Sequence, residues 1–159
     1  SISSADKLIT PEKNIKNGDP YQWQIEQSVN KIMQEINKEN VDHILSYQSR
    51  VGPLKWIGPS TEDVIIEYSK QGKHLVIVPI AFVSEHSETL VELDIEYKKL
   101  AKKNGCNDYT RIEALGINEY FIDAISSLIL SKDEYKFKNN LYPPKNRCPS
   151  NFTKCPCVI

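Results

Sequence analysis

The stretch LVIVPI at residues 75–80 decides the fold class of this protein. An uninterrupted apolar run of this kind is typical of a strand buried on both faces, as in parallel sheets that are covered by helices. Even when it is extended to Val83, the run is about half the length that a membrane-spanning helix requires. The sequence therefore predicts a buried parallel strand here and no transmembrane helix.

Helices and strands alternate around this strand. Hydrophobic periodicity predicts helices over residues 20–38, 61–68, 85–104 and 119–130, and strands over residues 43–48, 75–80 and 111–115. We expect the second helix to be capped by Ser60 or Thr61 and the third by Ser84. The same two helices are expected to end at Gly72 and Gly105. This alternation predicts an α/β fold with a layered, mostly parallel sheet.

Length and charge set broad limits on what the chain does. Its 159 residues suffice for one domain with its own core. We expect an irregular N-terminal segment at residues 1–18, an α/β domain at residues 19–131, and an irregular tail rich in Lys, Asn, Pro and Cys at residues 132–159. The formal net charge of -1 lacks the positive field of a nucleic-acid-binding protein. Residues 1–14 show no secretory signal, which predicts a cytoplasmic protein.

The segment SEHSETLVELDIEY at residues 84–97 follows the predicted buried strand, where open α/β sheets bind ligands. Its aligned carboxylates are Glu85, Glu88, Glu92 and Glu96. In an α-helix they share one stripe, which could bind a cation or pass protons along the row; a solvated helix face is the alternative. His86 would lie about 100° from the stripe, which favours a core or capping role. It meets Glu88 only if the first turn is not helical or contains a π-type bulge.

Trp56 lies in a loop between two Gly-Pro pairs, at residues 52–53 and 58–59. An aromatic side chain held in this way could stack on a flat ligand, and covering the sheet edge is the alternative. The loop is therefore a second candidate binding segment.

A cysteine cluster lies near the end of the sequence, at Cys148, Cys155 and Cys157. This layout fits reduced thiols or a metal better than disulfides. Zinc or an iron–sulfur cluster would need Cys106 or a partner chain as a fourth ligand. An incidental run of reduced cysteines remains the alternative.

Three ordered motifs resemble those of ferrochelatases. They are GDPY at residues 18–21, YQSRVGPLKWIGPST at residues 47–61, and VPIAFVSEHSETL at residues 78–90 with ELDIEY at residues 92–97. The resemblance covers about residues 11–130 and corresponds to the carboxyl-terminal half of that enzyme. It implies a Rossmann-like, chelatase-like three-layer domain. It also implies a lyase of haem and porphyrin biosynthesis, which inserts ferrous iron into protoporphyrin IX to make protohaem.

The resemblance also implies roles for single residues. Glu88 is expected to contact the metal and to remove pyrrole protons, with His86 as its neighbour. Glu92 and Glu96 are expected to lead protons or cation away from the site, and Trp56 to pack against the macrocycle. Family structures have a π-helix in this segment, which would bring His86 toward Glu88.

Two departures from the family pattern bear on activity. The family has a metal-ligating histidine just before the GDPY motif, whereas residues 5–14 contain none. We also expect the chain to lack the amino-terminal domain that forms the other wall of the family's cleft. We expect the chain alone to be inactive without a complementing N-terminal domain. The alternatives are a non-catalytic module that binds porphyrin, metal or a partner, and an inactive remnant. The resemblance further implies a [2Fe-2S] cluster at Cys148, Cys155 and Cys157, and peripheral association with the inner membrane.

Overall fold

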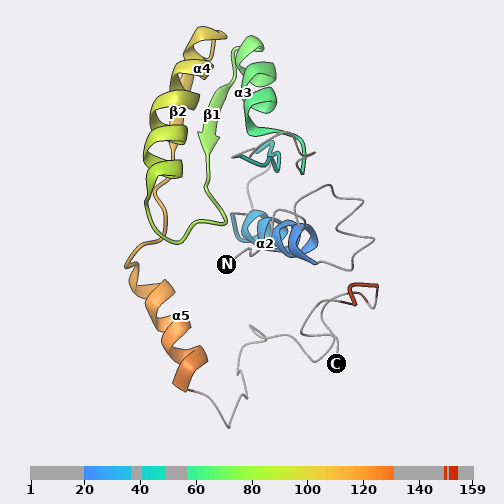
Figure 1. The fold of residues 1–159 in the computed structure, drawn as a ribbon, viewed down its shortest axis with the longest axis vertical. Helices are drawn as coiled ribbons and strands as arrows, with labels where there is room; N and C mark the ends of the chain where they lie inside the picture. Colours follow the sequence, from blue (N-terminus) through green and yellow to red (C-terminus); the bar gives the residue numbers. More distant parts are fainter. Residues whose placement is uncertain (1–19, 37–40, 49–56, 131–148, 150, 154–159) are drawn as a thin grey trace.

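The computed structural model describes residues 20–36, 41–48, 57–130, 149 and 151–153. In these residues the elements follow in the order α2 (Tyr21–Ile36), α3 (Thr61–Lys70), β1 (His74–Ile77), η2 (Glu88–Tyr97), α4 (Lys98–Lys103), β2 (Asp108–Arg111) and α5 (Glu119–Leu130). Figure 1 shows α3, the two strands and the continuous helix made by η2 and α4 gathered into one unit, with α2 and α5 below it. Helices that alternate with parallel strands confirm the α/β fold.

Local capping signals set the ends of the helices that precede the strands. Ser60 caps α3, since its Oγ accepts a hydrogen bond of 3.1 Å from the N–H of Asp63. Gly72 and Gly105 have φ angles of 66° and 91°, which glycine adopts without strain. Beyond Gly105, the next N–H donates to the carbonyl of Ala101 at 3.0 Å, as in a Schellman motif. The structure confirms the predicted caps at Ser60, Gly72 and Gly105.

The sheet pairs β1 with β2 in parallel, with His74 opposite Asp108 and Ile77 opposite Arg111. Helices η2 and α4 connect the two strands, as a parallel pair requires. Both strands therefore end at the same edge of the sheet.

The predicted strands were wrong in extent. The strand predicted over residues 111–115 lies earlier, at Asp108–Arg111, because Tyr109 provides the side chain that enters the core, whereas Ile112 and Leu115 stay exposed. The strand predicted over residues 43–48 is reduced to a single parallel bridge between Tyr47 and Ser60.

The prediction of a strand buried on both faces was also wrong. Strand β1 ends at Ile77, and its side chains alternate between half-buried and exposed positions. Val76 is 61% exposed and Val78 is 54% exposed. The helices thus cover one face of β1, and Val76, in the apolar run LVIVPI, lies on the face that they leave exposed.

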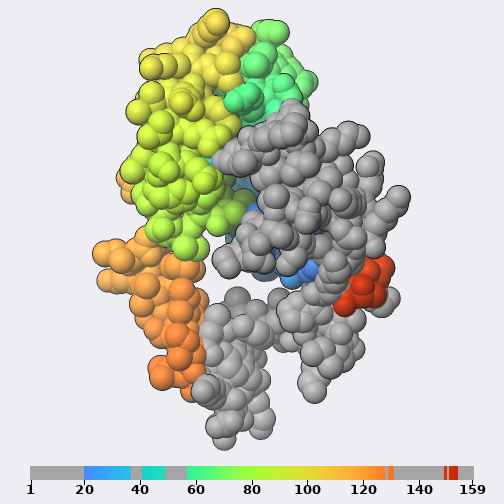
Figure 2. Space-filling model, viewed as in Figure 1, coloured from blue at the N-terminus to red at the C-terminus, as the bar shows by residue number. Residues whose placement is uncertain are grey.

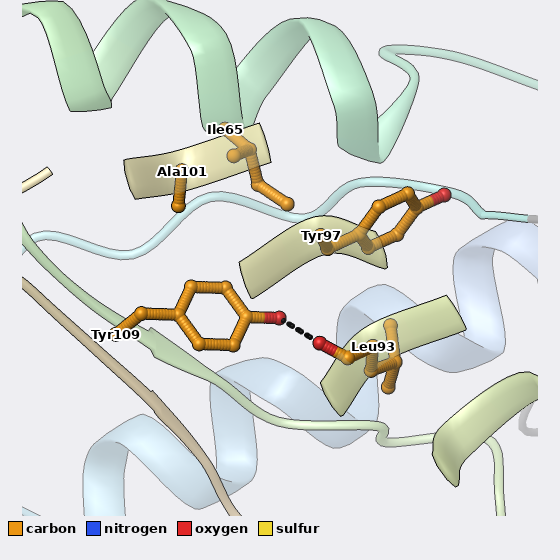
Figure 3. Packing of buried hydrophobic residues seen from close by; sticks show 5 residues of the cluster. All are labelled: Ile65, Leu93, Tyr97, Ala101 and Tyr109. Atoms are coloured by element: carbon orange, nitrogen blue, oxygen red, sulfur yellow. Dashed lines mark hydrogen bonds between the residues drawn. The ribbon is translucent and has the colours of Figure 1, made fainter. Parts of the chain in front are cut away.

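The core lies between the helices and the covered face of the sheet. It contains Ile65, Leu93, Tyr97, Ala101 and Tyr109, drawn in Figure 3. The Oη of Tyr109 donates a hydrogen bond of 2.7 Å to the carbonyl of Leu93, which joins β2 to η2. Burial raises the pKa of Tyr109, so this phenol keeps its proton and remains a donor.

The two outer helices match their predicted positions closely. Helix α5 has the predicted bounds, and its side chains form the lower-left edge of the face seen in Figure 2. Tyr120 and Leu130 are 86% and 82% exposed. On α2, the ring of Trp23 lies 6.0 Å from that of Phe152.

Within the described ranges, no helix combines the length and apolar character needed to cross a membrane.

Candidate active site

The site begins where the chain leaves β1. In Figure 1 the arrow of β1 points downward, and the loop that follows it turns back into η2 near its lower, carboxyl end; β2 is parallel to β1, so it ends at the same edge. Helix η2 is a π-helix that begins at Glu88, and Ser87 provides no side-chain cap. Winding of this type is often found at functional sites. The π-helix that the resemblance to ferrochelatases implied for this segment is therefore confirmed, whereas the cap predicted at Ser84 is wrong, because the helix begins later, at Glu88.

His86 and Glu88 lie together at the start of this helix. The N–H of Glu88 donates to Nδ1 of His86 at 3.2 Å, so the imidazole caps the helix in place of a serine. Because Nδ1 accepts a hydrogen bond, the proton of the neutral ring is on Nε2. The ring also packs edge-on against Phe82, with ring centroids 4.7 Å apart. The structure thus assigns His86 the capping role that its position suggested, directly beside Glu88.

Glu85 does not belong to the row of carboxylates. Its oxygens accept hydrogen bonds from Oγ1 of Thr89 (2.5 Å), the N–H of Ala114 (2.8 Å) and Nη1 of Arg111 (2.5 Å). These donors, the Thr89 hydroxyl first, lower the pKa of the Glu85 carboxyl to about 2. The Glu85 carboxylate is therefore ionised, and its oxygens already accept hydrogen bonds from the protein. The row of carboxylates on the helix starts at Glu88.

Arg111 fixes the middle of the helix as well. Its Nε and Nη2 donate to Oδ1 and Oδ2 of Asp94 at 2.7 and 2.6 Å, a two-pronged ion pair. The Arg111 side chain is 9% exposed. These hydrogen bonds lower the pKa of Asp94 and raise that of Arg111. Arg111 therefore connects the end of β2 to the helix and to the loop before it.

Glu92 is held on the other side of the same helix. Its carboxylate accepts a hydrogen bond of 2.6 Å from Oη of Tyr97 and one of 3.3 Å from Nε2 of Gln48. The same Gln48 amide lies 3.4 Å from the carbonyl of Glu88. Gln48 comes directly before the loop that carries Trp56, so it connects the two candidate segments. Glu88 and Glu96 are exposed, whereas Glu92 is half-buried.

Several predicted residues lie outside the described part of the chain. They are Trp56, Cys148, Cys155 and Cys157, together with the segment at residues 1–18 and most of the tail at residues 132–159. The Sγ of Cys106, the suggested fourth ligand, lies 3.3 Å from the carbonyl of Lys73 and 2.9 Å from that of Asp108, both within reach of its single thiol proton. No group of three His, Cys, Asp or Glu side chains able to hold a metal is found within the described residues.

Sequence reasoning missed the residues that hold the site in place. They are Gln48, Thr89, Asp94, Tyr97 as a partner of Glu92, and Arg111. Arg111 could have been found if the second strand had been placed at residues 108–111, since it would then end that strand at the binding edge of the sheet.

This fold and site define an α/β protein whose histidine and carboxylates gather beyond the carboxyl end of a parallel strand. A family model described as Ferrochelatase matches residues 9–133. The chain therefore belongs to the ferrochelatase family.

Individual relatives agree with this assignment. The chain is 74% identical to the ferrochelatase of Pelagibacter ubique over 148 residues, which are 93% of this chain and 43% of that protein. It is 48% identical to the ferrochelatase of Rickettsia prowazekii over 156 residues and 49% identical to that of Rickettsia felis over 152 residues. Each match covers 94% of this chain and 44% of the relative. The chain thus spans less than half the length of these relatives.

Proposed function

We propose that this chain forms the carboxyl-terminal part of a ferrochelatase active site, which inserts ferrous iron into protoporphyrin IX to make protohaem. The observation that carries the proposal is the contact between His86 and Glu88 at the start of a π-helix, beyond the carboxyl end of β1. Membership of the ferrochelatase family supports the same reaction. The proposal gives this chain one wall of a shared site.

Glu88 is the base and the metal contact in this proposal. Insertion replaces two pyrrole N–H protons by one Fe²⁺, so two protons must leave as the cation enters. An exposed carboxylate beyond the end of the strand can accept a proton and attract the cation. Glu88 has this exposure, and its backbone is fixed by His86 and Gln48.

Glu92 and Glu96 carry the protons away. Glu92 is held through both oxygens, Oε1 by Tyr97 and Oε2 by Gln48, so its carboxylate stays in a fixed place four residues after Glu88 on the same helix. Glu96, further along the helix, is exposed to solvent. A proton accepted at Glu88 can therefore pass to Glu92 and leave at Glu96.

His86 orients this row. Its Nδ1 is engaged by the N–H of Glu88, so Nε2 carries the ring proton and is the nitrogen left to act as a donor. The ring thus keeps the first turn in the geometry that exposes the Glu88 carboxylate.

The rest of the site rests on the family resemblance. Trp56 would supply the flat apolar wall for the macrocycle, and a complementing N-terminal part would supply the opposite wall and the metal-ligating histidine. A [2Fe-2S] cluster at Cys148, Cys155 and Cys157 also remains a prediction, and no step of the reaction depends on it.

The test uses a chimera in which residues 15–159 of this chain replace the corresponding part of Pelagibacter ubique ferrochelatase, so that the relative supplies everything that precedes them, including the segment before the GDPY motif that carries the metal-ligating histidine in the family. We expect the chimera to form protohaem from protoporphyrin IX and ferrous iron, and the Glu88→Gln variant to lower kcat at least about 100-fold, as loss of a general base does. Glu67→Gln on α3 is the matched control, because Glu67 is exposed and lies outside the site. A Glu88→Gln chimera as fast as the parent would refute the role of Glu88.

The 159-residue chain alone gives a second measurement. We expect negligible turnover from it, because the chain offers one wall of the site. Quenching of porphyrin fluorescence by the chain, with no activity in the chimera, would favour the non-catalytic binding module instead.

A further inference from the structure

One largely buried guanidinium joins the two ends of the segment that carries His86 and Glu88. Arg111 pairs with Glu85, directly before His86, and with Asp94, in the middle of η2. The Arg111 side chain is only 9% exposed, and its two-pronged contact with Asp94 fixes the plane of the guanidinium. Both ends of the segment are therefore fixed to the end of β2.

The two contacts with Arg111 require the observed winding of the segment. In a regular α-helix, steps of about 100° per residue would place Glu85 and Asp94 on opposite faces, about 180° apart. Arg111 reaches both because Glu85 comes before the helix and the Glu88–Tyr97 segment is a π-helix. Rewinding the segment as an α-helix would break one of the ion pairs.

A series of hydrogen bonds leads from this guanidinium to the site. Glu85 accepts from Oγ1 of Thr89 at 2.5 Å, and Thr89 Oγ1 accepts from the N–H of His86 at 3.0 Å. His86 in turn accepts from the N–H of Glu88. Thr89 is fully buried, so its hydroxyl cannot exchange these partners for water. Each bond fixes the position of the next group.

We propose that Arg111 is a positioning residue for the His86–Glu88 pair, which it holds in place through Glu85 and Thr89. Arg111 makes no contact with the substrate in this proposal. Its effect is to keep Nδ1 of His86 turned toward the N–H of Glu88, with the ring proton on Nε2. The effect of Arg111 on catalysis rests on the proposed function, whereas its effect on the position of the His86 ring does not.

The first test measures the ring of His86 in the 159-residue chain. At about pH 8, where imidazole is in general neutral, ¹⁵N NMR distinguishes a protonated from an unprotonated ring nitrogen. The signals are assigned with His86→Asn. We expect widely separated Nδ1 and Nε2 signals in the parent. In Arg111→Met they should move toward each other, as in a ring that exchanges tautomers.

Two further variants keep this test decisive if Arg111→Met folds poorly. Thr89→Val keeps the buried shape and both ion pairs but breaks the link to His86, so it should give the same spectral change. Lys70→Met, an exposed change at the end of α3, should leave the signals of His86 as in the parent. Unchanged ring signals in both Arg111→Met and Thr89→Val would overturn the proposal.

The second test measures kinetics in the chimera with the Pelagibacter ubique ferrochelatase. Arg111→Met and Thr89→Val should lower kcat at least about tenfold with little change in KM for protoporphyrin, because the substrate-contacting groups remain. Arg111→Lys should recover part of kcat, since it keeps the charge. A shift of the His86 signals together with an inactive parent chimera would support the positioning role and reject the proposed reaction. A loss confined to KM would overturn the positioning role.

Discussion

The Oη of Tyr97 lies 2.6 Å from Oε1 of Glu92, five residues earlier in the same helix. Five residues is the hydrogen-bond spacing of a π-helix, so this side-chain pair follows the winding of the backbone. Tyr97 is 4% exposed. Its burial raises the pKa of its phenol, and the hydrogen bond to Glu92 raises it further. The core of the protein thereby supplies a permanent donor to a carboxylate of the candidate site.

Replacing this donor should destabilise the fold. Tyr97→Phe removes a hydrogen bond to a charged group and should lower the free energy of unfolding by about 2 kcal/mol. Tyr120→Phe is the control, since Tyr120 is 86% exposed and should change stability by less than about 0.5 kcal/mol. Urea unfolding measures both. Equal stability of Tyr97→Phe and the parent would show that the hydroxyl contributes nothing.

The core side of η2 should carry most of its stability. Leu93 is 0% exposed, so Leu93→Ala should cost about 2 to 5 kcal/mol through lost burial and the cavity left behind. Leu90→Ala makes the same change on the same helix at a site that is 47% exposed, and should cost about 1 kcal/mol. A similar loss in both variants would contradict the placement of the core.

The Glu85 network should make stability depend on acid. The pKa of Glu85 is lowered in the folded protein from its ordinary value of 4.5 to about 2. Its contribution is therefore fully present above pH 4.5 and is lost as the pH falls toward 2. The difference in urea midpoint between the parent and Glu85→Gln should be constant near neutral pH and shrink over this acid range. A difference that grows on acidification would refute the sign of the shift.

Gly105 should resist substitution because of its backbone. Its φ of 91° is strained for any residue with a Cβ, although an added Cβ would meet nothing closer than the Ser69 carbonyl oxygen at 3.6 Å. Gly105→Ala should therefore cost about 1 to 2 kcal/mol. Gly105→Asn should cost less, since asparagine tolerates left-handed conformations better. Thermal unfolding separates the two, and equal losses would point to packing rather than backbone strain.

The acidic row should show a gradient of effects in the chimera. Glu92→Gln should lower kcat about tenfold, equivalent to about 1.4 kcal/mol, because Glu92 is the held carboxylate that follows Glu88 in the row. Glu96→Gln should have a smaller effect, since Glu96 lies in solvent and water can replace it. A larger loss in Glu96→Gln than in Glu92→Gln would contradict the proposed direction of proton transfer.

The features that the sequence predicted correctly are those decided by near neighbours. Ser60 caps a helix because its hydroxyl reaches an N–H three residues away, and Gly72 and Gly105 end helices because a left-handed residue is needed there. The bounds of α5 follow in the same way from local periodicity. The motifs at residues 47–61 and 78–97 were likewise sufficient to indicate the ferrochelatase family, which the match over residues 9–133 confirms.

Contacts between distant segments decided the rest. Strand β2 begins at Asp108 because pairing with β1 and the burial of Tyr109 set its register, and no local pattern contains that partner. α-Helical spacing could not show that His86 lies beside Glu88, because the π-helix that brings them together is held by groups far away in the chain. Arg111 and Gln48 are such groups, 17 residues after Asp94 and 44 residues before Glu92. The sequence alone predicted which residues are candidates for the chemistry, and the tertiary structure decided which of them meet, because only folding brings distant charges together.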